Sequence, residues 1–513
     1  MTASGPDPLL VLRPDDDVGV ARRDLSAGER VVIGDREVTV AAAVPAGHKI
    51  ALTDLPEGAR VRKYGEVIGV ATVAIAAGDH VHTHNLQMAE LDHAAARVRV
   101  VPPVTPLPEA EQRTFAGIVR PDGAVATRNY IGVLTTVNCS ATTARRIADQ
   151  VTRSGLLDEH PGVDGIVALA HGTGCGLAAD GPGLELLRRT LSGYARHPNF
   201  GALLVVGLGC EVNEISALTR GIELPESTPM VPLTIQELGG TRRTTDAGVG
   251  IVRDLLPDLD RVRREPVPVS RLVLGLNCGG SDGWSGVTAN PALGLAVDEL
   301  VRQGGTAVLA ETPEVYGAEH LLTGRCVDEA VAARLMERIA WWERYTAATG
   351  GSMDNNPSPG NKAGGLTTIL EKSLGAVAKA GSTPLAEVVE YAERVHGPGL
   401  VFMDTPGYDP VSVTGIIAGG ASVVCFTTGR GSAFGAKPVP SIKLATNSEV
   451  FRRMRDDMDV DCGAVLEGER TLEETGREIF ERILAVASGE KTASEELGYG
   501  DEEFTPWQLG AVM

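Results

Sequence analysis

The chain repeatedly places a short apolar run directly before a polar or glycine-rich turn. Runs such as GIVALA at 165–170 and LVLGLN at 272–277 are aliphatic and rich in β-branched residues, as buried parallel strands are. Helical periodicity fills intervals between the runs, at 141–153, 183–195, 291–303 and 327–345. This alternation predicts an α/β fold with mainly parallel sheets.

The turns after these runs contain cysteine, asparagine and charged residues, which a chain reversal does not require. Because ligands in open α/β sheets bind beyond the carboxyl ends of the strands, we expect the turns to share one site. The alternative is that glycine only permits a tight strand-to-helix reversal in each of them. The six turns are VNCS at 137–140, HGTGCG at 171–176, GLGCE at 207–211, NCGGSDG at 277–283, ETPE at 311–314 and TTGRGS at 427–432.

The first part of the chain has a different texture. Residues 1–97 contain short strand-like segments separated by Gly, Asp and Pro, which predicts a small all-β module. Four prolines at 98–113 prevent a helix or a central strand, so a linker is expected there. Two α/β domains are predicted after it, at 114–265 and 266–513, divided at a proline-containing stretch.

Charge and motif content exclude several classes of function. A formal net charge of -20 would repel nucleic acid, and an anionic ligand would need local cations. No apolar run approaches the roughly 20 residues that span a bilayer, and no signal peptide is evident. Gly207 and Gly209 lack the third glycine of a dinucleotide fingerprint, and no phosphate loop occurs. We therefore expect a cytoplasmic protein that binds neither nucleic acid nor membrane.

Histidines in the β-module are candidate metal ligands. His80, His82 and His84 lie in HVHTHN, and alternation would put them on one face of a strand. His48 follows Gly47 in a separate segment. Imidazole suits iron, manganese and zinc, although a solvent-exposed histidine stripe is an equally simple interpretation.

Two glycine-flanked segments are candidate anion sites. Asn361 and Lys362 lie in NPSPGNKAGG, whose prolines and glycines prevent regular structure. Arg430 lies between Gly429 and Gly431, which would let a carboxylate approach its guanidinium group. A structured surface loop is the alternative in both cases.

Four cysteines lie in the turns that follow apolar runs, and the chain has seven in all. An odd, dispersed set fits a reducing compartment better than a disulfide framework. The four could ligate iron or an iron–sulfur cluster, but their spacing matches no standard cluster motif, and buried inert cysteine is common. They are Cys139, Cys175, Cys210 and Cys278.

Several motifs together resemble the altronate and galactarate dehydratase family over nearly the whole chain. They are GHK at 47–49, KYGEVIG at 63–69, GLGCE, CGGSDGWSGVTANP at 278–291, NPSPGNKAGG at 356–365 and TTGRG at 427–431. The resemblance implies an N-terminal β-clip module of the SAF type, followed by two α/β domains. HVHTHN, EVYGAEHLL and KAGSTP are more similar to the altronate branch. The resemblance to the family also implies Fe²⁺ as the cofactor, with Mn²⁺ as the alternative. An iron–sulfur cluster is left open.

Dehydration of a sugar acid removes a proton from C2, next to a carboxylate, and the hydroxyl from C3. A divalent metal would stabilise the charge of the resulting enediolate, while a base and an acid assist. From the matching motifs we expect catalytic residues among His48, Glu211, Asp282, Lys362 and Arg430. Lys49, Tyr64, Ser281 and Asn361 are expected to bind substrate with Lys362 and Arg430. The candidate metal ligands are His48, His82, His84, Glu311, Cys139, Cys175 and Cys278.

Competing interpretations involve related chemistry or none. Galactarate dehydration and sulfite elimination from sulfolactate would proceed through the same kind of enolate, formed by removal of the proton at C2. A non-catalytic sugar-acid binding protein is the alternative from another class, because β-clip modules also occur as binding appendages. Apart from the small-molecule substrate, the expected partner is a second copy of the chain, as a homodimer.

Overall fold

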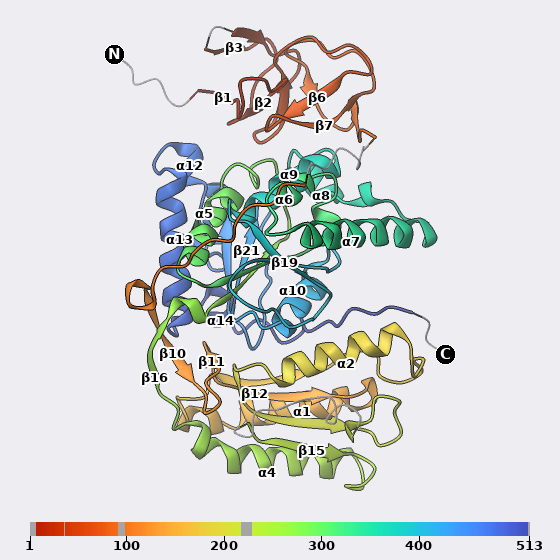
Figure 1. Cartoon of the computed structure of the whole chain (residues 1–513), viewed down its shortest axis with the longest axis vertical. Coiled ribbons are helices and arrows are strands. Elements are labelled where there is room, and N and C mark those ends of the chain that lie inside the picture. The colour runs from red at the N-terminus through yellow and green to blue at the C-terminus, as the bar shows by residue number, and fades with distance from the viewer. Residues whose placement is uncertain (1–6, 35, 91–97, 217–227, 511–513) are drawn as a thin grey trace.

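The computed structural model describes residues 7–34, 36–90, 98–216 and 228–510. Three bodies are stacked along the long axis of the molecule (Figure 1). The N-terminal module lies at one end, the C-terminal α/β domain in the centre, and a smaller α/β domain at the other end. None of the described helices has the length and apolar character that crossing a membrane requires.

The N-terminal module is built from short antiparallel strands, which confirms the predicted all-β fold. One sheet has the order β1-β2-β5-β8, another has the order β6-β7-β9, and β3 and β4 form a hairpin. The predicted end of this module, residue 97, lies outside the described residues. The strands are β1 (Leu9–Leu10), β2 (Val18–Ala21), β3 (Arg30–Ile33), β4 (Arg36–Thr39), β5 (Lys49–Ala51), β6 (Arg60–Lys63), β7 (Glu66–Ala71), β8 (His80–Val81) and β9 (Leu86–Gln87).

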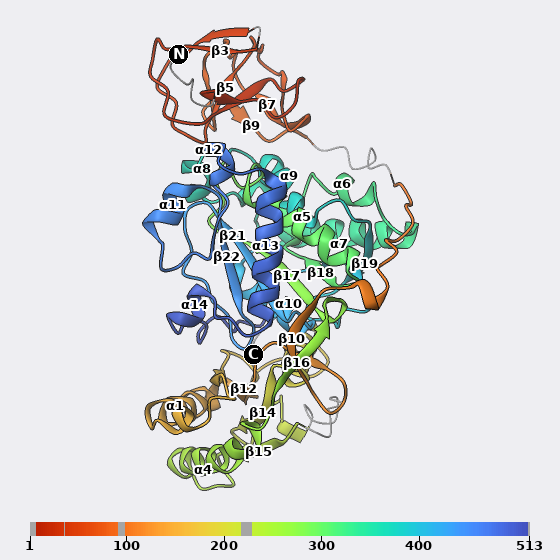
Figure 2. The ribbon, with the colours of Figure 1, turned by 90° about the vertical axis from the view of Figure 1, so that its left-hand side faces the viewer.

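A paired ribbon carries the chain into and out of the smaller α/β domain. Strand β10 (Thr114–Val119) pairs antiparallel with β11 (Val125–Ala126) and with β16 (Arg264–Pro268). The two long partners run side by side between the domains (Figure 2). The predicted boundary at 265 therefore falls inside a strand, because Pro266 and Pro268 are accommodated at the edge of a three-stranded sheet.

The smaller α/β domain contains a four-stranded parallel sheet in the order β13-β12-β14-β15. Helices α1 and α4 cover one face, where Ile147 and Val252 are fully buried, and α2 covers the other. The elements are β12 (Tyr130–Thr135), α1 (Ala141–Arg153), β13 (Gly165–Leu169), α2 (Pro182–Ala195), β14 (Phe200–Gly207), β15 (Met230–Thr234) and α4 (Thr241–Leu259).

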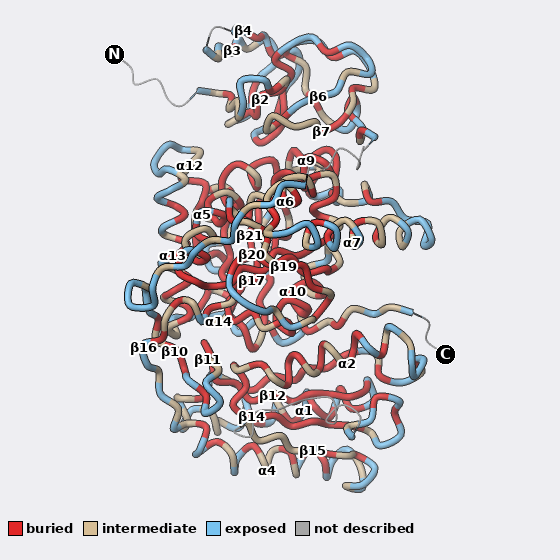
Figure 3. The backbone as a smooth tube through the Cα atoms, viewed as in Figure 1, coloured by how far each residue is buried: buried red, intermediate tan, exposed pale blue. Residues whose placement is uncertain are grey.

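The C-terminal domain is built on a seven-stranded parallel sheet in the order β19-β20-β18-β17-β21-β22-β23. Its central strands are buried except for the first residue of β17 (Figure 3), because helices cover both faces. The strands are β17 (Val273–Cys278), β18 (Thr306–Leu309), β19 (Leu385–Val389), β20 (Gly399–Met403), β21 (Val423–Thr428), β22 (Ser441–Ala445) and β23 (Val460–Asp461). The helices are α5 (Ala289–Arg302), α6 (His320–Thr323), α7 (Glu329–Ala348), α8 (Pro359–Ala363), α9 (Ile369–Val377), α10 (Asp409–Ala418), α11 (Ser448–Arg453), α12 (Ala464–Glu467), α13 (Leu472–Ala487) and α14 (Ala493–Glu496).

The two parallel sheets divide the six polar turns into two groups of three. The turns at 137–140, 171–176 and 207–211 follow β12, β13 and β14, whereas those at 277–283, 311–314 and 427–432 follow β17, β18 and β21. The expectation that all six share one site within the chain is therefore wrong. Apolar runs show that strands exist, but not which of them hydrogen-bond into the same sheet.

Candidate active site

A cleft of about 520 Å³ opens at the carboxyl end of the seven-stranded sheet. Cys278 ends β17, Glu314 follows β18, Asp409 follows β20 and Arg430 follows β21, so four strands supply its polar groups. Lys372 enters from α9. This is the place where an open parallel sheet binds its ligand.

Buried charged groups line the floor of the cleft and lie directly beneath it. Lys372 Nζ lies 2.5 Å from Glu314 Oε1, and Lys379 Nζ lies 2.8 Å from Cys278 Sγ and 3.6 Å from Glu311 Oε2. Cys278 Sγ is 3.2 Å from Glu314 Oε2. All five side chains are at least nine-tenths buried, so their charges interact strongly with one another.

Burial and neighbouring charges set the protonation of these groups. Burial and the charge of Glu314 raise the pKa of Glu311 well above its usual range. Burial acts in the same direction on Glu314, but Lys372 and Lys379 outweigh it, and the pKa of Glu314 is lowered. Burial, followed by Glu314, raises the pKa of Asp409 to about 7. An ionised and a protonated carboxyl group therefore lie side by side, an arrangement suited to acid–base chemistry.

Cys278, Glu311 and Glu314 are arranged as a metal site would be. Each offers one ligand atom, and these atoms lie within 4.8 Å of one another. Glu311 Oε1 is buried without a hydrogen-bond partner among the described residues, which is costly unless a proton or cation occupies it. A thiol with two carboxylates suits a transition metal better than Mg²⁺. The set therefore fits a divalent transition metal.

The backbone of Glu311 supports the same interpretation. Its φ of 69° and ψ of 68° place a non-glycine residue in the left-handed region. Its N–H donates to Thr405 Oγ1 at 2.9 Å, which holds this conformation. Strained backbone that the surrounding structure maintains is concentrated at functional sites.

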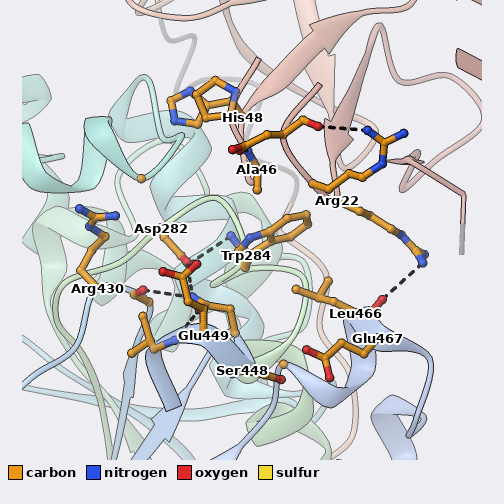
Figure 4. A pocket seen from close by; sticks show the side chains of 18 of the residues that line it. Arg22, Ala46, His48, Asp282, Trp284, Arg430, Ser448, Glu449, Leu466 and Glu467 are labelled. Atoms are coloured by element: carbon orange, nitrogen blue, oxygen red, sulfur yellow. Dashed lines mark hydrogen bonds between the residues drawn. The ribbon is translucent and has the colours of Figure 1, made fainter. Parts of the chain in front are cut away.

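A second cavity, of about 630 Å³, lies between the N-terminal module and the C-terminal domain (Figure 4). His48 and Arg22 enter it from the module, while Asp282, Trp284 and Arg430 enter it from the domain. Arg430 also lines the cleft, so this residue lies where the two cavities adjoin. Among the described residues it has no carboxylate partner, unlike Lys372.

Asp282, Ser281 and Asn361 hold the loops around Arg430 in place. The buried carboxylate of Asp282 accepts hydrogen bonds from Thr446 Oγ1 at 3.0 Å and from Asn447 Nδ2 at 3.1 Å. Asn361 Nδ2 donates to the carbonyl of Ser281 at 2.9 Å. The structure thus places Asp282, Asn361 and Arg430 together, as the sequence predicted, but the first two side chains are occupied in protein contacts.

Lys49 and Tyr64 lie in the contact between the module and the domain rather than in a cavity. Lys49 is fully buried and donates to Gly365 O at 2.6 Å and to Glu371 Oε2 at 2.8 Å. Tyr64 packs against the backbone of Gly286. The predicted substrate-binding role does not fit Lys49 in this position, because its ammonium group is already paired. Lys362 is half-buried in α8.

The four histidines of the module gather at the same contact. Ring centroids of neighbouring imidazoles lie 5.0 to 5.6 Å apart, and His82 Nε2 lies 2.9 Å from the carbonyl of Lys362. Burial lowers the pKa values of His48, His80 and His82, so these rings are neutral. Among the described residues, however, no three of them bring ligand atoms within 4.8 Å of one another, so one ion would not be held by His48, His82 and His84 as they lie.

Three of the predicted site residues lie in the other α/β domain. Glu211, Cys139 and Cys175 follow strands of the four-stranded sheet, at the end of the molecule opposite the N-terminal module (Figure 1). They do not join Arg430 within the chain, because the strands that position them belong to a different sheet.

The cleft also contains residues that the sequence did not single out. Lys372 and Lys379 lie in or just after a fully buried helix, where nothing in the local pattern distinguishes them from structural lysines. Asp409 is the last residue of the polar turn DTPGYD, which follows the apolar run GLVFM, so the pattern that identified the other turns would have found it.

Three sequence families match consecutive parts of the chain. Residues 7–89 match the altronate/galactarate dehydratase SAF domain, which confirms the predicted module type. Residues 117–260 match the D-galactarate dehydratase/altronate hydrolase second domain. Residues 269–512 match the D-galactarate/altronate dehydratase C-terminal domain.

Curated relatives agree with these matches. The chain is 39% identical to altronate dehydratase of Escherichia coli K12 over 94% of its own length and 95% of the relative's. It is 40% identical to galactarate dehydratase (L-threo-forming) of the same organism over 89% and 88% of the two chains. The beta subunit of (2R)-sulfolactate sulfo-lyase from Chromohalobacter salexigens is 34% identical over 76% of this chain and 97% of the subunit. The separate alpha subunit of that enzyme is 39% identical over 86 residues, which are 15% of this chain and 92% of the subunit.

Proposed function

Because this chain belongs to the D-galactarate/altronate dehydratase family, we propose that it converts D-altronate to 2-dehydro-3-deoxy-D-gluconate. That it is a sugar-acid dehydratase, a hydro-lyase, follows from relatives at about 39% identity over most of the chain. These relatives disfavour the non-catalytic alternative. Cytoplasmic location and a homodimer stay predictions from the sequence.

The charge at the cleft supports a substrate with one carboxylate. Lys372 is neutralised by Glu314 at 2.5 Å, which leaves Arg430 as the lining cation without a carboxylate partner in the described chain. An aldonate such as altronate has one carboxylate to match it, whereas galactarate has two. A planar guanidinium group binds one carboxylate through two parallel hydrogen bonds.

The residues of the cleft divide the reaction between them. We assign Arg430 to the substrate carboxylate and Asp409 to the proton at C2, since Asp409 lines the cleft with a pKa near neutrality. Cys278, Glu311 and Glu314 would hold Fe²⁺, or alternatively Mn²⁺, which when bound stabilises enediolate charge. Lys372 keeps Glu314 ionised. His48, which lines the adjoining cavity, is the candidate for protonating the departing C3 hydroxyl once its neutral ring has taken up a proton.

A substrate panel tests the assignment to altronate. The enzyme, purified without oxygen and supplied with Fe²⁺, is assayed for 2-keto-3-deoxy acid formation from altronate, galactarate and sulfolactate. We expect kcat/KM for altronate to exceed that for galactarate by at least about tenfold, because Arg430 is the one side-chain cation lining the cleft that has no carboxylate partner among the described residues. A preference for galactarate would refute the substrate assignment and leave the dehydratase class intact.

The assignment of Asp409 predicts a pH profile. As a base it must be ionised, so kcat/KM should fall as the pH drops below about 7. Asp409→Asn should lower kcat/KM by about 10²- to 10⁴-fold and abolish this limb of the profile. Asp254→Asn, on the exposed face of α4, is the matched control and should behave as wild type. An unchanged acidic limb in Asp409→Asn would mean that another group takes the proton.

A further inference from the structure

Three solvent-exposed cysteines lie at one edge of the four-stranded sheet. Cys139 follows β12, Cys175 follows β13 and Cys210 follows β14, and β12 hydrogen-bonds to both neighbours. The other four cysteines are buried in the C-terminal domain. Exposed free thiols are rare on protein surfaces because they oxidise, so three on adjacent strand ends call for an explanation.

Hydrogen bonds join the loops that carry these cysteines. The N–H of Asn138 donates to Thr173 O at 2.9 Å, and Asn213 reaches both Gly174 O, at 3.2 Å, and Thr136 O, at 3.0 Å. Gly174 has a φ of +102°, and a Cβ there would lie 2.2 Å from Thr136 O. Only glycine therefore allows the loop of Cys175 to close on the loop of Cys139.

Glu211 orders the third loop. Its buried carboxylate accepts hydrogen bonds from Thr136 Oγ1 at 2.6 Å and from the N–H groups of Gly209 and Cys210 at 2.7 and 2.9 Å. Burial acts to raise the pKa of Glu211, but the hydrogen bonds that its carboxylate accepts outweigh burial. The pKa is therefore lowered and the group is ionised. The residue that the sequence assigned to the reaction thus fixes the backbone that presents Cys210.

The three thiols do not converge as the ligands of one small ion would. In the described parts of the chain they are not all within 4.8 Å of one another, whereas thiolates around one tetrahedral ion would be. An iron–sulfur cluster holds its cysteines at separate iron atoms and so spans a wider set. We propose that Cys139, Cys175 and Cys210 bind an iron–sulfur cluster through three thiolates.

The site would be separate from the cleft, and it would leave one iron of the cluster without a cysteine ligand. No fourth cysteine lies at this edge, because the remaining four of the seven belong to the other sheet's domain. One iron of a four-iron cluster would therefore carry a ligand that is not a cysteine. His171, the nearby imidazole, is already occupied, with Nε2 2.9 Å from Thr135 O and Nδ1 accepting from the N–H of Thr173.

Iron and sulfide analysis of the full-length protein tests the proposal. The chain is produced with iron, purified without oxygen and measured for iron, acid-labile sulfide, visible absorption and the paramagnetic resonance of the reduced form. We expect iron and sulfide in comparable amounts in wild type. Cys175→Ser alone should lower both at least severalfold. The Cys139→Ser/Cys175→Ser/Cys210→Ser variant should lack sulfide and the visible absorption and keep only the iron of the cleft, with unchanged circular dichroism.

Cys278→Ser is the matched control, because it removes the thiol of the cleft and leaves this edge intact. It should retain sulfide and absorption even where dehydratase activity is lost, which separates this proposal from the proposed function. Iron without sulfide, zinc alone, or full sulfide content in a folded triple variant would each overturn the cluster.

Discussion

Replacing Glu311 by glutamine is expected to lower kcat/KM by about 10³-fold and to weaken metal binding. The substitution keeps the size of the side chain but removes the charge of the ligand whose Oε1 has no protein partner among the described residues. Groups that stabilise charge developing in a transition state commonly contribute this much. Activity is measured as keto acid formation over a range of Fe²⁺ concentrations, beside metal content after gel filtration.

Two comparisons make the Glu311 result specific. Glu337→Gln, on the exposed surface of α7, changes the same chemical group and should match wild type in both measurements. The pKa of Glu311 is raised, so metal binding to the wild type should release a proton, and the variant should release less. A Glu311→Gln enzyme with wild-type metal content and turnover would remove the proposed metal site from Cys278, Glu311 and Glu314.

Local sequence pattern predicted individual elements well. The periodic segment at 141–153 has the same bounds as α1. The segment at 183–195 ends with α2 and starts one residue later than that helix does. Helix α4 was not predicted, because Gly248, Gly250 and Pro257 lower its helical propensity and only packing on the sheet stabilises it. The HVHTHN segment forms a strand only at His80 and Val81 before it turns. Its imidazoles still gather beside His48, because β8 pairs with β5 next to that residue.

The candidate site was less predictable, since it depends on contacts between distant segments. Arg430 and Asp282 were found because glycines mark their turns. Lys372 and Glu371 are buried in a short helix, and only the tertiary structure shows that each has a carboxylate or ammonium partner 58 to 322 residues away in the sequence. Cys139 and Cys278 follow strands of different sheets. Which strands pair into one sheet likewise depends on contacts between distant segments.

The second large effect is expected at Glu371, which joins the N-terminal module to the C-terminal domain. Its fully buried carboxylate receives Lys49 Nζ at 2.8 Å and Lys63 Nζ at 2.9 Å, both from the module. Burial tends to raise the pKa of Glu371, but the two ammonium groups lower it more, so the carboxylate is charged. Glu371→Gln would leave two buried ammonium groups without a counter-charge. We expect it to cost about 3–5 kcal/mol of stability, the usual result of breaking a buried ion pair.

The same substitution should reduce activity, because His48 is adjacent to Lys49 and its Nε2 lies 3.2 Å from the carbonyl of Ala363 beside Arg430 and Asp282. Denaturant unfolding and keto acid formation measure the two effects. Glu481→Gln breaks the exposed pair with Arg113 and should cost no more than about 1 kcal/mol. Replacing Lys49 and Lys63 by methionine and Glu371 by leucine removes all three charges together and should recover much of the lost stability. If Glu371→Gln unfolds like Glu481→Gln, the triad does not hold the module in place, and the wall that carries His48 must be positioned by the apolar contacts of Trp284 and Val20.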